Sequence, residues 1–361
     1  MIESPKVSVV IATYNRANYI HETVESIFRQ SFRDYELIVV DDGSTDDTGK
    51  ILEPYHSRLQ YIYQANSGPS RARNMGVRHA RAPWIAFQDS DDLSEPDHLA
   101  TLYAHANEHP GCGMVFANGA YLGGPEHNRQ TIVPAKKSHR LASEGVRLLD
   151  LFEKSVVRLQ AALISKKAYH AIGGHDESLR ICMDLDLSFR LFMHSSMVYL
   201  DRVVFRYRKH EGNIGRNEEL RLIENIRVIQ KLIDEFPNAK QELGARRVAR
   251  RMGKDVRVIL IKLADRVHNM PPANLKTRKI FSVSPLWDLE GKHCRVLARL
   301  PGWRSHPAHR VGRAAIEYAS KEAKKMRPSS SGRPWEPPSR SKKFSSTRRR
   351  GGSFSNPPLP S

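Results

Sequence analysis

The sequence predicts an α/β fold in which helices flank a doubly wound, mostly parallel sheet. Short runs rich in Val and Ile alternate with segments of helical spacing through the first half of the chain. Those runs are continuously apolar, as strands buried on both faces are. The chain has 361 residues, 40% of them hydrophobic, which suffices for one large domain with an appendage or for two modest domains.

Five segments are expected to be strands, because each is a short apolar run bounded by polar or turn residues. They are residues 7–13 (VSVVIAT), 35–42 (YELIVVDD), 59–64 (LQYIYQ), 84–89 (WIAFQD) and 114–118 (MVFAN). Because helical segments separate most of them, we expect these strands to lie mainly parallel in one sheet.

Helices are expected between the strands, over residues 18–31, 70–80 and 95–109. In the first of these, Ile20, Val24 and Ile27 recur at helical intervals and define one apolar face. Pro96 is expected near the first turn of the third, where proline is tolerated. A further helix is expected after GSTDDT, with Ser44 or Thr45 as its N-cap.

Three of the predicted strands end in polar residues: TYN at 13–15, DDGS at 41–44 and DSDD at 89–92. In doubly wound sheets, ligands bind beyond the carboxyl ends of the strands. The three polar ends therefore predict a binding site at one edge of the sheet.

The stretch FQDSDDLSEPD, residues 87–97, concentrates five carboxylates in a chain whose net charge is +19. Like charges this close repel one another, so a divalent cation or full solvent exposure should compensate them. Glu95 and Asp97 are expected to belong to the first turn of the following helix, where acidic residues favour the helix dipole.

Five segments in order resemble the family 2 glycosyltransferases of the GT-A fold, over residues 5–215. They are VSVVIATYNRANYIHETVESIFRQSF, YELIVVDDGSTDDT, NSGPSRARNMGV, WIAFQDSDD and GGHDESLRICMDLDLSFRL. The resemblance implies a mixed, mostly parallel sheet. It also implies an inverting, metal-dependent transfer from a nucleotide-sugar, expected to be UDP-linked, to a glycan or lipid-linked acceptor. Cell-surface polysaccharide synthesis is the usual task of such enzymes.

The resemblance implies a nucleotide-sugar site made by the strand ends and the helix after them. The residues it assigns are Thr13, Asn15, Asp42, Arg71 and Asp89. Asp42 would accept from the base or ribose, while Asp41 contacts the nucleotide or orients the loop. A helix N-terminus with Arg71 or Arg73 beside it suits a diphosphate, although a solvated basic helix face explains either arginine alone.

DSDD looks like the DxD motif of the family, which implies a Mn²⁺ or Mg²⁺ cofactor. Asp91 is the expected direct ligand, and Asp89 faces the ribose or reaches the metal through water. Asp92 is a candidate supporting residue. His210, in RYRKHEGNIGR, matches a histidine that approaches the diphosphate or metal in the family. The alternatives are an acidic exposed turn and a surface histidine.

The segment GGHDESLRICMDLDL, residues 173–187, looks like the acceptor side. In the family a helix-opening Glu-Asp pair commonly supplies the catalytic base. Here Met183 holds the Glu place and Asp184 the Asp place, so Asp184 is the expected base. Asp186 competes for that role, and a helix N-cap is the structural alternative for Asp184. The lost Glu leaves open a catalytically degenerate GT-A module that binds nucleotide or glycan without turnover.

We predict a glycosyltransferase domain over residues 1–217, a helical basic region of unassigned role over 218–327 and a tail over 328–361. The tail is rich in Ser, Pro and Arg, with Glu336 as its single acid, so it is expected to be disordered. The basic C-terminal region is expected to contact anionic membrane peripherally. No specific nucleic-acid binding is predicted.

Residues 254–270 (KDVRVILIKLADRVHNM) also resemble one helix of the guanosine tetraphosphate synthetase/hydrolase family. That resemblance matches Asp265 to a metal ligand and Asn269 to a nucleotide contact. The family site also needs a His and a His-Asp pair, and the one His-Asp dipeptide here, 175–176, lies in the acceptor segment. We therefore interpret residues 254–270 as a packing helix, with nucleotide hydrolysis as the alternative.

The sequence favours a cytoplasmic protein at the inner face of the membrane. No apolar run approaches the roughly 20 residues of a spanning helix, and no signal peptide is evident. The three cysteines are scattered without a CxxC pair, which suits a reducing compartment.

Overall fold

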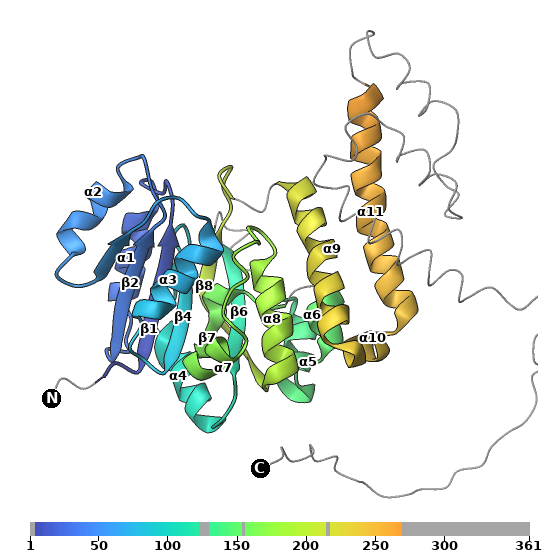
Figure 1. Ribbon diagram of the computed structural model, residues 1–361. Helices are drawn as coiled ribbons and strands as arrows, with labels where there is room; N and C mark the ends of the chain where they lie inside the picture. Colours follow the sequence, from blue (N-terminus) through green and yellow to red (C-terminus); the bar gives the residue numbers. More distant parts are fainter. Residues whose placement is uncertain (1–3, 123–129, 154–155, 214–216, 269–361) are drawn as a thin grey trace, which may run out of the picture.

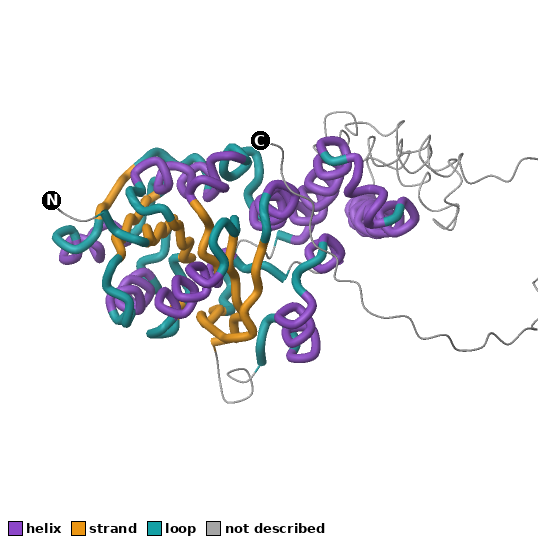
Figure 2. Tube along the Cα trace, turned by 90° about the horizontal axis from the view of Figure 1, so that it is seen from below, coloured by secondary structure: helices purple, strands orange, loops and turns teal. Residues whose placement is uncertain are grey.

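The computed structural model describes residues 4–122, 130–153, 156–213 and 217–268. Within them the chain forms one eight-stranded sheet with helices on both faces (Figure 1; Figure 2). The strand order is β3-β2-β1-β4-β7-β6-β8-β5. The predicted α/β class is confirmed.

The first half of the sheet is parallel. Its strands are β1 (Val7–Thr13), β2 (Tyr35–Asp41), β3 (Gln60–Tyr63) and β4 (Trp84–Asp89). β1 pairs with β2 and β4, and β2 pairs with β3. The register sets Thr13 beside Asp41 and Ala12 beside Asp89. The three predicted polar strand ends therefore meet at one edge.

The second half of the sheet makes it mixed, as the resemblance implied. Its strands are β5 (Leu93–Ser94), β6 (Met114–Leu122), β7 (Ala162–Ser165) and β8 (Met197–Arg208). β7 runs antiparallel to both β4 and β6, whereas β8 runs parallel to β6. The short β5 pairs with the far end of β8 through Leu93 and Arg206. This pairing brings the end of β8 beside the acidic segment that follows β4.

Hydrophobic clusters fill the space on both faces of the sheet. In β1, Val10 packs into one cluster and Val9 and Ile11 into the other, because successive strand residues point to opposite faces. One cluster includes residues of α1 (Ile20–Phe28) and α4 (His98–Glu108), and the other includes residues of α3 (Pro69–His79) and α8 (Met183–His194). Each fully buried side chain of this kind contributes about 1.5–3 kcal/mol to stability.

Two local predictions around the helix starts were wrong. The helix after GSTDDT, α2 (Thr48–Leu52), has Asp47 as its N-cap rather than Ser44 or Thr45. Asp46 supplies the capping carboxylate, which accepts from the Thr48 amide at 3.0 Å. Pro96 lies before α4, which begins at His98.

Glu95 and Asp97 also differ from expectation. Both precede α4, and both pair with arginines of β8: Glu95 with Arg206, at 2.5 Å, and Asp97 with Arg202. These two carboxylates therefore fasten the start of α4 to β8 instead of lying in the first turn of the helix.

Short helices complete the part that precedes β8: α5 (Ala135–Glu144), α6 (Leu148–Glu153), α7 (Lys166–Ala171) and the 3-10 turns Glu53–Tyr55 and Leu159–Ala161. Three helices then follow β8, namely α9 (Glu218–Glu235), α10 (Pro237–Leu243) and α11 (Ala245–His268). Leu187 and Leu191 of α8 share a hydrophobic cluster with Ile226 and Ile229 of α9. Residues 218–268 are therefore helical, as predicted, and pack on the sheet domain.

Several predictions concern residues that the structure does not describe. Residues 269–327, the tail 328–361 and Asn269 lie outside the described residues, and nothing of the Asp265 side chain is described. Among the described residues, no helix has the length and apolar character needed to cross a membrane.

Candidate active site

A cavity of about 460 Å³ opens beyond the carboxyl ends of β1, β2 and β4. Five of the predicted site residues line it: Thr13, Asn15, Asp42, Asp89 and Asp91. Arg73 and Met183 line it as well, whereas Arg71, Asp184 and His210 are not among its lining residues. The strand ends therefore converge on one cavity.

The Asp42 carboxylate organises the loop that leads into α3. It accepts from the Gln64 side chain at 2.6 Å and from the amides of Ser67 and Gly68 at 2.9 and 2.8 Å. Gly68 has φ = 96°, a conformation that side-chain-bearing residues rarely adopt. Asp42 thus holds the wall of the cavity.

Asp41 orients the loop after β2, one of the two roles that the sequence left open. Its carboxylate accepts from the Ser44 amide and from the Tyr61 hydroxyl, both at 2.8 Å. Burial, followed by the hydrogen bond to Asp41, raises the pKa of Tyr61, so the phenol stays protonated.

Asn15 and Thr13 place polar groups at the end of β1. Asn15 has φ = 51°, and its Oδ1 accepts from the Thr45 amide at 2.8 Å. The backbone N–H of Asn15 donates to Ser44 Oγ at 2.9 Å. The buried Thr13 Oγ1 has no hydrogen-bond partner within the described residues. Asn15 is therefore fixed by the loop, while the Thr13 hydroxyl remains available.

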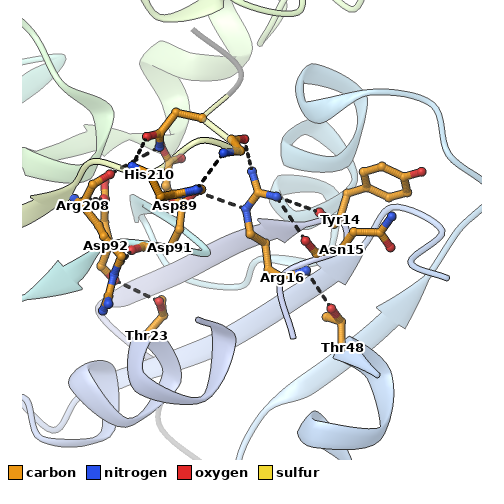
Figure 3. A network of polar contacts seen from close by, with 12 residues as sticks. Tyr14, Asn15, Arg16, Thr23, Thr48, Asp89, Asp91, Asp92, Arg208 and His210 are labelled. Atoms are coloured by element: carbon orange, nitrogen blue, oxygen red, sulfur yellow. Dashed lines mark hydrogen bonds and ion pairs between the residues drawn. The ribbon is translucent and has the colours of Figure 1, made fainter. Parts of the chain in front are cut away.

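The carboxylates of Asp89, Asp91 and Asp92 gather after β4, with oxygens within 4.8 Å of one another. Asp91 Oδ2 lies 3.1 Å from Arg16 Nε and 2.8 Å from His210 Nε2 (Figure 3). His210 therefore approaches the acidic cluster from the segment after β8.

Asp92 is the buried member of the acidic cluster. Its Oδ1 accepts from the Arg208 amide at 2.8 Å, and its Oδ2 has no partner within the described residues. Burial raises the pKa of Asp92 well above its ordinary value, and the charges of Asp89 and Asp91 raise it further. The described residues therefore do not fully balance the negative charge of the Asp92 carboxylate.

The acidic cluster fits a divalent metal. Carboxylate oxygens, with the His210 imidazole nearby, suit Mn²⁺ and Mg²⁺. The unpartnered Asp92 oxygen and the mutual repulsion of three carboxylates are features that a cation would relieve. Asp91 and His210 could hold such an ion, with Asp89 and Asp92 beside it.

Arg73 links the acidic cluster to the start of α8. Its Nη2 donates to Asp89 Oδ1 at 2.6 Å, and its Nη1 lies 2.7 Å from Met183 Sδ. The other Asp89 oxygen accepts from Gln160. Met183, in the place where the family has Glu, thus contacts a buried guanidinium.

Asp184 lies in the first turn of α8, half-buried, and its carboxylate has no hydrogen-bond partner within the described residues. Burial raises the pKa of Asp184; the charge of Arg73 opposes this rise and that of Asp89 adds to it. The N-cap of α8 is Cys182, so the N-cap alternative for Asp184 was wrong. The carboxylate is therefore free to accept a proton.

The competing carboxylate Asp186 is engaged elsewhere. It is 2% exposed, it pairs with Arg190, whose Nε lies 2.8 Å away, and its Oδ1 lies 3.1 Å from Lys231 Nζ. The side chains of Arg190 and Lys231 therefore hold Asp186 in the interface between α8 and α9.

Arg71 is exposed and lies outside the cavity. Its Nε is 3.9 Å from Glu177, and its side chain is 57% exposed. Arg73, two positions on, is the arginine of this helix that faces the acidic cluster.

The sequence reasoning named neither Arg16 nor Gln160, both of which contact the acidic cluster. Arg16 follows the first polar strand end directly, so its position in TYNR was an available signal. Gln160 lies in a 3-10 turn far along the chain, where no local pattern marks it. Arg16 also donates to the backbone oxygens of Asn15 and Gly212, both at 3.1 Å. It thereby ties the strand end to the segment after β8.

Comparison with known proteins gives one family model and several glycosyltransferases, and the chain spans less than two thirds of the length of some of these relatives. The model of glycosyl transferase family 2 matches residues 8–173. Glycosyltransferase GlyG of Streptococcus pneumoniae serotype 4 is 38% identical over 232 residues, which are 60% of this chain and 74% of GlyG. A glycosyltransferase of Rickettsia prowazekii is 29% identical over 58% of this chain, and the match spans 65% of that relative.

Solved structures share the fold. TarS 1-349 of S. aureus in complex with UDP-GlcNAc superposes with a TM-score of 0.55 at 21% identity, covering 89% of this chain and 92% of that one. Mannosyltransferase PcManGT from Pyrobaculum calidifontis, in complex with GDP-Man and Mn²⁺, gives 0.53 at 18% identity, covering 90% and 89%. From the family match and the likeness to GlyG, this chain belongs to glycosyl transferase family 2.

Proposed function

We propose that this enzyme is a metal-dependent, inverting glycosyltransferase. Its donor is a nucleotide-sugar, UDP-linked in our proposal, and its acceptor is a glycan or lipid-linked hydroxyl used in cell-surface polysaccharide synthesis. The observation that carries the proposal is the position of Arg73. Its guanidinium bonds to Asp89 of the acidic cluster and contacts Met183, the residue next to Asp184 in the sequence.

In the proposed reaction, the acceptor hydroxyl oxygen attacks the anomeric carbon of the donor. The carboxylate of Asp184 takes the hydroxyl proton as the new glycosidic bond forms. The bond between the anomeric carbon and the diphosphate oxygen breaks, and the diphosphate leaves with the bonding electrons. One displacement inverts the anomeric centre, and general-base help of this kind is worth about 10²–10⁴-fold in rate.

The residues of the cavity divide the remaining work. Thr13, Asn15 and Asp42 bind or frame the nucleotide at the ends of β1 and β2. Asp91 and His210 would hold Mn²⁺ or Mg²⁺, with Asp89 and Asp92 in support. A bound divalent ion supplies charge neutralisation to the leaving diphosphate. Arg73 adds fixed positive charge between donor and acceptor.

Two structures of the same fold support a nucleotide-sugar donor, since TarS was solved with UDP-GlcNAc and PcManGT with GDP-Man and Mn²⁺. The direct test is a thermal-shift screen of the purified protein with UDP-, GDP- and dTDP-sugars, each with and without Mn²⁺. We expect a metal-dependent rise in melting temperature with UDP-sugars. No shift with any of the three classes would contradict the proposed donor.

We also propose that the glycosyltransferase domain ends at residue 217. In this proposal the basic C-terminal region contacts anionic membrane peripherally, and the enzyme acts at the cytoplasmic face. The exposed side chains of Arg246, Arg247 and Arg250 on α11 support such a contact. Binding of the full chain to vesicles of anionic lipid, against vesicles of neutral lipid, tests it.

A further inference from the structure

Helix α9 contacts the segment that leads into α8 at several points. Lys231 Nζ lies 2.9 Å from Asp176 and 3.1 Å from Asp186, on either side of Asp184 in sequence. Arg227 donates to Ser178 Oγ at 3.0 Å. The segment that carries the proposed base is therefore held by side chains from a helix about 45 to 55 positions further along the chain.

Glu224 makes the closest of these contacts. Its side chain is 1% exposed, and its Oε1 accepts from the Arg180 amide at 2.9 Å. Its Oε2 accepts from the amides of Ile181 and Cys182, both at 2.8 Å. One carboxylate thus engages three consecutive backbone N–H groups.

These three amides immediately precede Met183, the first residue of α8. The amides at a helix start lack partners within the helix, and a nearby Ser, Thr, Asp or Asn side chain usually satisfies one of them. Here the N-cap is Cys182, whose side chain makes no capping hydrogen bond. Glu224 of α9 accepts instead from the N-cap amide of Cys182 and from the two amides before it, so it fixes the backbone that enters α8.

Within the part of the chain that the structure describes, no hydrogen bond fixes the Asp184 carboxylate, so the backbone before it determines where that carboxylate lies. We propose that Glu224 is a positioning residue for the transfer reaction, because it holds the N-terminal turn of α8 and so aims Asp184 at the acceptor hydroxyl. This inference rests on the proposed role of Asp184 as the base. With this role of Glu224, the region after residue 217 contributes to catalysis.

Glu224→Gln tests the inference with little change in shape. The amide group keeps one acceptor oxygen and turns an NH₂ toward backbone N–H groups, so at least one of the three bonds is lost. A misplacement of about 1 Å can slow a reaction about 10²-fold, so we expect kcat to fall about 10–100-fold. The KM for the nucleotide-sugar and the affinity for Mn²⁺ should stay within about twofold, because the donor residues lie on other elements.

The assay is nucleotide release from UDP-GlcNAc and GDP-mannose with Mn²⁺, where water replaces the unidentified acceptor. Asp234→Asn is the matched control, since it removes one exposed carboxylate from the same helix. Glu224→Asp keeps the charge but is one methylene shorter, and we expect its kcat to lie between those of the wild type and Glu224→Gln. If Glu224→Gln does not fold, kcat and hydrogen exchange of Glu224→Asp are compared with those of the wild type instead.

Hydrogen exchange gives a readout that needs no turnover. Exchange at the amides of Arg180, Ile181 and Cys182 should accelerate in Glu224→Gln and stay unchanged in Asp234→Asn. Wild-type kcat, or wild-type protection of these amides, in the Glu224 variants would overturn the inference. Full activity of Asp184→Asn would instead overturn the proposed function. The two failures are therefore distinguishable.

Discussion

His210 Nε2 lies 2.8 Å from Asp91 Oδ2, although the two residues are 119 positions apart. The contact exists because β8 pairs with β5 directly after the acidic cluster, Leu93 lying beside Arg206. The segment after β8 thereby closes over the end of β4. This relationship joins the two residues that we propose as metal ligands.

His210→Ala should weaken Mn²⁺ binding about 10–100-fold, the usual effect of removing a residue close to a metal. The reason is that Asp91 would lose its imidazole partner and the ion one nitrogen donor. Titration of Mn²⁺ followed by electron paramagnetic resonance measures the change. His139→Ala, at a side chain that is 88% exposed, is the control and should leave the affinity as in the wild type. Equal affinities in the two variants would show that His210 is not a ligand.

Asp184→Asn should lower kcat about 10²–10⁴-fold, since the amide cannot take a proton. Only the ionised carboxylate is a base, and burial raises the pKa of Asp184. The acid limb of the wild-type kcat profile should therefore lie above the ordinary Asp value of about 3.9. A kcat profile over pH 4–9 for both proteins checks this. An unchanged acid limb in Asp184→Asn would assign the base elsewhere.

Asp92→Asn should stabilise the metal-free protein at pH 7 by about 1 kcal/mol, the ordinary scale of a point substitution. The raised pKa of Asp92 means that the folded state binds its proton more tightly than the unfolded state does. Stability is then lost as pH rises from the unfolded value through the folded one. The asparagine variant lacks this loss and can still accept from the Arg208 amide.

The measurement for Asp92 is urea unfolding with chelator at pH 7 and at pH 4. The advantage of the asparagine variant should shrink at the lower pH, where the wild-type carboxyl is protonated. A variant less stable than the wild type at pH 7 would show that the Asp92 charge is already compensated by the protein.

Asp42→Asn should raise the KM for the nucleotide-sugar about tenfold or more with a smaller change in kcat. Hydrogen bonds to a charged group are worth about 1.5–3 kcal/mol, and this carboxylate holds the amides of Ser67 and Gly68. Steady-state kinetics against donor concentration measure the effect. Asp34→Asn, at an exposed position before β2, is the control. A fall in kcat at constant KM would place Asp42 in the chemical step instead.

The sequence predicted the elements with a strong local signal. The strands that became β1 to β4 and β6 were found because continuous Val and Ile runs have one interpretation in an alternating chain. Their polar ends then predicted the site, since parallel strands must share an edge. The capping of α2 by Asp46 was missed, because several polar residues compete for one cap and only geometry selects among them.

Contacts between distant segments could not be predicted. Arg16 and Asp91 are 75 positions apart, and Glu224 and Arg180 are 44 apart. No periodicity or motif encodes such pairs, because packing of helices on the sheet brings them together. The pairing of Asp186 with Arg190 and Lys231 is a partial exception, since the Arg190 contact follows the helical i,i+4 spacing.

We propose that the acidic cluster after β4 binds a divalent ion and that the transfer requires this ion. The most direct measurement is nucleotide release from a UDP-sugar by the wild type and Asp91→Asn, in chelator and over a Mn²⁺ titration. We expect no release in chelator, recovery of the wild type with Mn²⁺, and a rate about 10²–10³-fold lower for Asp91→Asn at saturating metal. Full wild-type release in chelator, or an Asp91→Asn variant that responds to Mn²⁺ as the wild type does, would contradict it.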